Sequence, residues 1–83
     1  MEGKTDMPIA VSRYRFIAFS KVTGTPVFHG RALEGVRRLI EQSPIHRAID
    51  YEILDCGDAG EHVFYKYLPL YMVKDKGLGK LAE

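Results

Sequence analysis

The chain has 83 residues, of which 46% are hydrophobic and 28% charged, and its formal net charge at pH 7 is +1. This length predicts one small domain, and the composition argues against disorder and against a strongly basic or acidic molecule. The charges are nevertheless uneven, because residues 1–48 carry eight Lys or Arg against four Asp or Glu, whereas residues 49–83 carry four against seven. A basic half and an acidic half can therefore pair within the fold or between two copies.

The first twenty-nine residues predict a tail and two strands. Residues 1–8 are expected to form a flexible tail. Residues 11–20, VSRYRFIAFS, are rich in aromatic and β-favouring residues and predict a strand. The glycine and proline of KVTGTP, residues 21–26, predict a turn, and residues 27–29 predict a short second strand leading into a helix.

Residues 30–42, GRALEGVRRLIEQ, give the clearest local signal and predict an amphipathic helix. Its apolar face is formed by residues at three- and four-residue spacing: Leu33, Val36, Leu39 and Ile40. Gly30 is the expected N-cap, and Ser43 before Pro44 is expected to end the helix, because a residue before proline avoids the α region. Gly35 is unusual inside a helix, so it marks either a tolerated surface position or the close approach of another backbone.

The second half of the chain predicts two more strands. Residues 49–56, IDYEILDC, alternate as a half-buried strand does, and GDAG at 57–60 predicts a turn. Residues 62–73, HVFYKYLPLYMV, predict another strand, with Pro69 at an edge or a bulge because proline cannot donate to the ladder. Residues 76–83 are expected to form a flexible tail.

Together these elements predict a single α+β domain of ββαββ order, with a mainly antiparallel sheet and one helix packed on one face. The strands at 11–20 and 62–73 carry apolar residues on both sides, and one helix cannot cover both faces of a sheet. The pattern therefore predicts either self-association, as a homodimer, or a protein partner on the second face.

An alternative fold follows from a resemblance. Over residues 14–74 the order of elements resembles a thioredoxin-like domain, closest to the redox-inactive type found in circadian-clock proteins. The resemblance is carried by three dipeptides: Thr25-Pro26, Leu54-Asp55 and Leu68-Pro69. It implies a truncated thioredoxin-like βαβ-β fold in which Pro69 follows a cis peptide bond. The chain departs from that family in having no Cys-x-x-Cys motif and too few residues after Pro69 for the usual last strand and helix.

Residue types that carry chemistry are sparse, so we expect no catalytic residues, no metal and no cofactor. Cys56 is the single cysteine, which excludes an intramolecular disulfide and fits a reducing cytoplasm. Acidic neighbours should raise its pKa and make it a poor nucleophile. His29, His46 and His62 have no zinc-motif spacing, and a hairpin at GDAG would bring at most Cys56 and His62 together.

No targeting segment is evident in the sequence. The N-terminal residues lack the continuous apolar core of a signal peptide, and the longest apolar run, residues 67–73, is too short to span a bilayer. We therefore expect a cytoplasmic protein with no membrane contact.

The function that these observations favour is a small non-enzymatic binding protein, an adaptor or an inhibitor of a larger complex. Phage-encoded anti-CRISPR-type inhibitors are an analogy of size and layout only. The alternative is a nucleic-acid-binding protein that uses an Arg/Tyr sheet face and the helix arginines. Because Tyr and Arg are the usual anchors of protein interfaces, the predicted partner-binding residues are Arg13, Arg15, Arg37, Arg38, Tyr65, Tyr67 and Tyr71.

Overall fold

The computed structural model describes residues 14–44 and 47–82. In chain order its elements are strands β2 (Phe16–Ser20) and β3 (Pro26–Gly30), helix α2 (Leu33–Gln42), 3-10 turn η1 (Ala48–Asp50), strand β4 (Tyr51–Asp55), 3-10 turn η2 (Gly57–Ala59), helices α3 (Gly60–Lys66) and α4 (Leu70–Asp75), and strand β5 (Lys80–Leu81). The predicted ββαββ order therefore holds as far as β4 and differs after it. The tail predicted at 1–8 lies outside the described residues.

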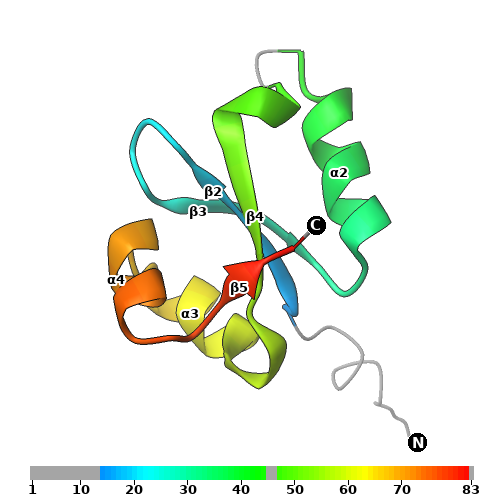
Figure 1. The fold of residues 1–83 in the computed structure, drawn as a ribbon. Helices are drawn as coiled ribbons and strands as arrows, with labels where there is room; N and C mark the ends of the chain where they lie inside the picture. The colour runs from blue at the N-terminus through cyan, green and yellow to red at the C-terminus, as the bar shows by residue number, and fades with distance from the viewer. Residues whose placement is uncertain (1–13, 45–46, 83) are drawn as a thin grey trace, which may run out of the picture.

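The four strands form one antiparallel sheet in the order β3-β2-β4-β5 (Figure 1). Strand β2 is central, and its residues Ile17, Ala18 and Phe19 are fully buried. Helix α2 packs on one face of this sheet, where it contacts β2 and β3. The predicted α+β class, with a mainly antiparallel sheet and a helix on one face, is confirmed.

Helix α2 buries a narrower face than its sequence pattern predicted. Val36 and Ile40 are fully buried against the sheet, whereas Leu39 is 42% exposed. A Cβ placed on Gly35 would meet nothing within 4 Å, so this glycine is a surface position, and no backbone of the described part of the chain approaches it closely.

The two ends of α2 differ in how well they were predicted. Ala32 is the N-cap residue, and Gly30 belongs to β3, so the predicted glycine cap is wrong. A side chain at Gly30 would also crowd Val36, since its Cβ would lie 3.0 Å from the valine Cγ2. At the other end Ser43 has extended backbone angles, which confirms the predicted stop before proline.

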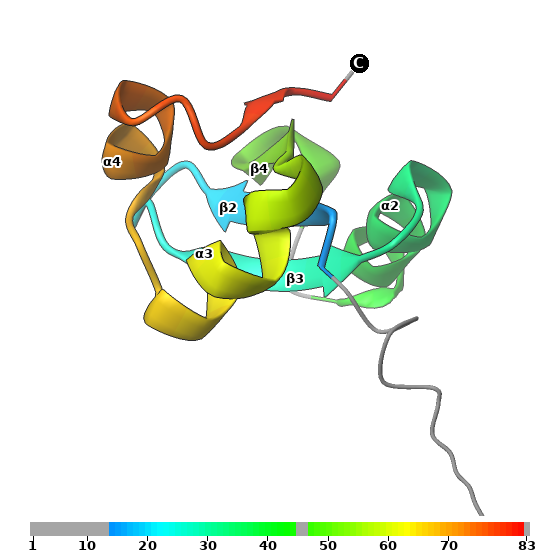
Figure 2. The same cartoon turned by 90° about the horizontal axis from the view of Figure 1, so that it is seen from below.

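The second face of the sheet is covered by α3 and α4, which lie on the side opposite α2 (Figure 2). The strand predicted over residues 62–73 is therefore wrong. Val63 on α3 and Val73 on α4 are both fully buried in the cluster that packs on this face. Burial of these residues outweighs the β-propensity of the Val, Phe and Tyr in the segment, because that propensity depends on packing context. Pro69 separates the two helices and is the N-cap of α4.

One apolar cluster thus packs on each face of the sheet. The cluster under α2 contains Ala18, Val36, Ile40 and Tyr51. The cluster under α3 and α4 contains Ile17, Phe19, Leu54, Cys56, Val63 and Val73. Helices therefore lie against both faces of β2 in the described sheet, and the wholly open second face that led us to expect self-association or a protein partner is not present.

The fourth strand lies in the segment predicted as a flexible tail, residues 76–83. Strand β5 pairs with the end of β4, with Lys80 opposite Asp55 and Leu81 opposite Leu54. Ala82 follows it, is buried, and donates its N–H to the carbonyl of Ile53 over 3.0 Å. The chain after β4 therefore does not form a hairpin at GDAG. Residues 57–60 form η2 and the start of α3, and the strand that pairs with β4 on this side is β5.

The thioredoxin-like alternative is wrong. In that alternative the strand before the Thr25-Pro26 loop and the strand that ends at Leu54-Asp55 form the βαβ unit, so these two strands must run parallel. Strands β2 and β4 are antiparallel, in register from the Phe16–Asp55 pair to the Ser20–Tyr51 pair. A helix rather than a strand follows Pro69, and the described residues include no cis peptide bond.

Candidate functional site on helix α3

Four ring side chains gather where the start of β2, the end of β3 and helix α3 meet. They are Tyr14, His29, Phe64 and Tyr67. The Tyr14 and His29 ring centroids lie 3.8 Å apart, and those of His29 and Phe64 lie 4.4 Å apart. Phe64 also lies 5.2 Å from Tyr14 and 5.8 Å from Tyr67, which are ordinary spacings for interacting rings. The rings therefore form a continuous aromatic cluster along one side of α3.

The cluster depends on a close approach between two backbones. A Cβ placed on Gly60 would lie 1.2 Å from the carbonyl oxygen of Tyr14, so no other residue fits at the first position of α3 without moving one of the segments. Glycine at this position lets the helix start directly against the chain that enters β2. That contact places Tyr14 beside Phe64.

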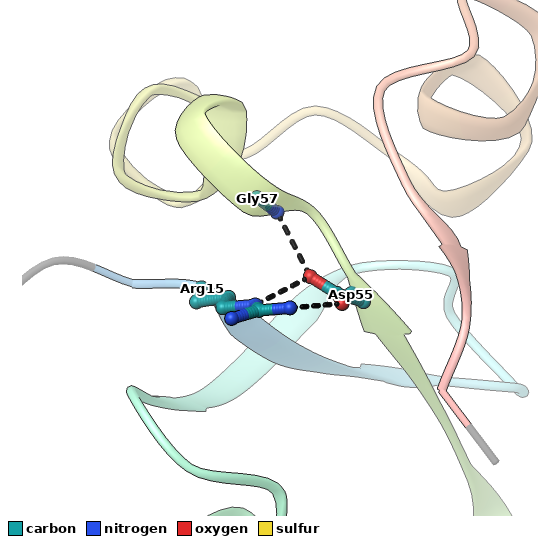
Figure 3. Close-up of polar contacts among 3 residues, drawn as sticks. All are labelled: Arg15, Asp55 and Gly57. Carbon is teal, nitrogen blue, oxygen red and sulfur yellow. Dashed lines mark hydrogen bonds and ion pairs between the residues drawn. The ribbon is translucent and has the colours of Figure 1, made fainter.

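An ion pair next to this contact joins three segments (Figure 3). The Arg15 Nε and Nη2 donate to the two carboxylate oxygens of Asp55 at 3.0 and 2.9 Å, in the two-pronged geometry that suits a guanidinium. The Gly57 N–H donates to the same carboxylate at 3.1 Å, and the Cys56 N–H donates to the Arg15 carbonyl at 2.7 Å. The start of β2, the end of β4 and the turn into α3 are thereby fixed relative to one another.

The charges of this pair stabilise each other. The hydrogen bond from Arg15 holds the pKa of Asp55 below its usual value, and the N–H of Gly57 acts in the same direction. The carboxylate in turn raises the pKa of the Arg15 guanidinium. Arg15 therefore lies at the surface as half of a matched pair rather than as an uncompensated positive charge.

Two shallow hollows flank the exposed side of α3. The first, of about 350 Å³, is lined by Tyr14, Glu61, Phe64, Tyr65 and Tyr67. The second, of about 390 Å³, is lined by Asp58, Glu61, His62 and Tyr65. Tyr65 and Glu61 line both, and they are four residues apart on the helix. Tyr65 is 78% exposed and Tyr67 is 65% exposed, so this surface combines accessible rings with carboxylates.

Tyr67 has an unusual backbone conformation. It ends α3 with φ of 54° and ψ of 40°, in the left-handed region, and it is the one non-glycine residue with positive φ in the described part of the chain. Glycine is preferred at this position of a helix because the left-handed conformation crowds a Cβ. Non-glycine residues held in the left-handed region cluster at functional sites, where the side chain is needed for another reason.

The arginines predicted from sequence do not form one surface. Arg13 lies outside the described residues, and Arg15 is paired with Asp55. Arg37 and Arg38 lie on α2, on the other side of the sheet from α3. Arg37 lines a groove of about 640 Å³ between α2, β4 and β5, whose other charged residues are Lys21, Glu41 and Glu52.

The predicted tyrosines are partly brought together. Tyr65 and Tyr67 share the first hollow, whereas Tyr71 is exposed on α4 and lines neither hollow. The sequence reasoning missed Tyr14, Glu61 and Phe64. The four-residue spacing of Glu61 and Tyr65 would have placed them on one helix face, but only if residues 62–73 had been assigned as helix.

The described residues hold no candidate metal centre, since no group of three or more His, Cys, Asp or Glu side chains is placed to bind an ion. Cys56 packs in the apolar cluster under α3, while His62 is exposed on that helix. Burial, with a smaller contribution from Asp55, raises the pKa of the Cys56 thiol to about 11, so little thiolate is present at neutral pH.

Within the described ranges, no helix has the length and apolar character needed to cross a membrane. Comparison of the chain with protein-family models, with curated proteins and with solved structures finds no match.

Proposed function

We propose that this chain is a small non-enzymatic binding protein that contacts another protein through the surface formed by Tyr14, Glu61, Phe64, Tyr65 and Tyr67, called the α3 surface below. The observation that supports this proposal is the exposure of Tyr65 and Tyr67 beside a concave, aromatic-lined hollow. Tyrosines that are accessible next to a recess are typical anchors of protein interfaces, because they bury a large area with little loss of side-chain freedom.

The α3 surface is also preorganised for binding. The close contact of Gly60 with Tyr14 and the Arg15–Asp55 pair hold its elements in place from behind. A surface that does not have to order itself on binding loses less entropy, which raises its affinity for a given contact area. We place the protein among adaptors or inhibitors of larger complexes, in a reducing compartment such as the cytoplasm, which suits its single cysteine.

Nucleic-acid binding, the alternative, has less support. Tyr65 and Tyr71 lie on helices rather than on a sheet face with arginines, and Arg15 is paired with Asp55. Asp58 and Glu61 lie next to Tyr65, where they would repel a phosphate backbone. The arginines of α2 share their helix with Glu34 and Glu41.

Site-specific photo-crosslinking tests the proposal. A benzophenone amino acid is introduced at Tyr65 and, in a matched control, at Arg38 on α2, which is also exposed but lies on the other side of the sheet. In cells that produce the protein, we expect the first position to capture a partner that the second does not capture. Capture of a second copy of the chain would identify the partner as the protein itself.

The captured protein is then purified and its affinity is measured by calorimetry. Replacing Tyr65 by Ala should weaken binding by at least about tenfold, as removal of an interface anchor does. Replacing the neighbouring exposed Lys66 by Ala should change the affinity by less than about threefold. Equal affinities of the Tyr65→Ala variant and the unmodified protein would show that the α3 surface is not the binding site.

A further inference from the structure

We propose that the first hollow of the α3 surface receives the guanidinium group of an arginine side chain from the partner protein. This inference rests on the proposed function and specifies the chemistry of the partner. At about 350 Å³ the hollow is at the small end of the range for ligand sites and has room for one side chain.

The wall of the hollow suits a flat cation. Tyr14, Phe64 and Tyr67 follow one another along it, with ring centroids 5.2 and 5.8 Å apart. The faces of aromatic rings attract cations, and a guanidinium stacks on them because it is planar and weakly hydrated. The molecule already contains one such contact elsewhere, since the Arg15 Cζ lies 5.0 Å from the ring centre of Phe16.

The charge of the hollow selects a cation rather than a neutral group. Glu61 lines it, and Asp58 lines the neighbouring hollow together with Glu61. Among the described residues Glu61 has no ion-pair partner, in contrast to Asp55, whose carboxylate is occupied by Arg15 and Gly57. A free carboxylate beside aromatic rings can accept the two parallel N–H bonds of a guanidinium while the rings cover its face.

A titration followed by NMR tests this inference without knowledge of the partner. The probe is N-acetyl-arginine-N-methylamide, added to the ¹⁵N-labelled full chain at constant ionic strength. The matched probe is the citrulline compound, which has nearly the same shape but no charge. We expect the arginine probe to shift the amide signals of Tyr14 and of residues 60–67 in a saturable manner, and the citrulline probe to bind at least about fivefold more weakly.

Two charge-removing variants locate the site. Glu61→Gln should weaken binding of the arginine probe by about fivefold, the effect of losing one partly exposed ion pair and its hydrogen bonds. Glu34→Gln removes the same charge from α2 and should leave the affinity unchanged. Equal binding of the two probes, equal affinities in the two variants, or no saturable shifts in residues 60–67 would each overturn the inference.

The result also separates this inference from the proposed function. A crosslinked partner whose binding is lost in Tyr65→Ala but unchanged in Glu61→Gln would support the α3 surface as an interface and overturn the arginine assignment. Specific binding of the arginine probe, with no partner captured at position 65, would support the hollow as a guanidinium site and count against the proposed protein interface.

Discussion

The left-handed residue at the end of α3 allows a sharp test of the local structure. Tyr67 has φ of 54°, whereas Lys66, one residue earlier, is the last helical residue of α3. We consider glycine and alanine at each of these two exposed positions. Comparing the two small residues at one position cancels most of the contacts that the native side chain makes, including the ring contact of Tyr67 with Phe64. The difference between them then reports the backbone conformation.

The expected difference in the free energy of unfolding between the glycine and alanine variants has opposite signs at positions 67 and 66. In the left-handed region an L-residue with a Cβ is disfavoured by roughly 1–2 kcal/mol, a cost that glycine does not have. Allowing for the greater freedom of glycine in the unfolded chain, Tyr67→Gly should be more stable than Tyr67→Ala by about 1 kcal/mol. In a right-handed helix alanine is preferred, so Lys66→Ala should be more stable than Lys66→Gly by roughly 0.5–1 kcal/mol.

Urea unfolding followed by far-ultraviolet circular dichroism measures all four free energies of unfolding. In a domain of this size 1 kcal/mol corresponds to a shift of roughly 4–8 °C in Tm, well within the resolution of a melting experiment. If alanine were preferred over glycine at both positions, the left-handed end of α3 would not exist in solution. We further expect Tyr67→Gly to bind the partner less well than the native chain, because the strained residue supplies an exposed ring to the α3 surface.

Three further experiments test the close approach at Gly60, the burial of His29 and the burial of Cys56. Gly60→Ala should lower the free energy of unfolding, measured in urea, by about 3 kcal/mol or more, because its Cβ would lie 1.2 Å from the Tyr14 carbonyl oxygen. Gly35→Ala, whose Cβ would have no atom within 4 Å, should raise the free energy of unfolding by up to about 1 kcal/mol. Equal stability of these two variants would contradict the close approach. Burial lowers the pKa of His29 below its unfolded value of 6.5, because the folded protein disfavours the charged imidazole. The stability associated with neutral His29 is therefore fully present above about pH 6.5, and it is lost as the pH falls below that value, where the unfolded chain binds the proton more readily. His29→Phe should therefore reduce the fall in stability between about pH 7.5 and 5.5, and an unchanged slope would refute this assignment. Burial raises the pKa of Cys56 from 9.0 to about 11, which lowers the thiolate fraction, although a thiolate of higher pKa is intrinsically more reactive. The folded protein should therefore react with Ellman's reagent at least about tenfold more slowly than the urea-unfolded chain, and rapid labelling of the folded protein would contradict the burial of Cys56.

The candidate site could be predicted only in part. Tyr65 and Tyr67 were identified because tyrosine is typical of interfaces, which depends on residue type alone. The arrangement that makes them a surface could not be identified in the same way, because Tyr14 lies about fifty residues away in the sequence and Arg15 pairs with a carboxylate 40 residues away. Contacts over such separations depend on strand order, which the hydrophobic pattern does not specify.

The sequence by itself determined those elements whose periodicity fits only one structure. Residues 33–42 have apolar spacing that suits only a helix, and residues 16–20 and 51–55 have the aromatic and alternating patterns of strands. The tertiary structure decided the remainder. Residues 62–73 carry β-favouring side chains, yet they form two helices, because this arrangement buries Val63 and Val73 against a sheet face that would otherwise lie open to water.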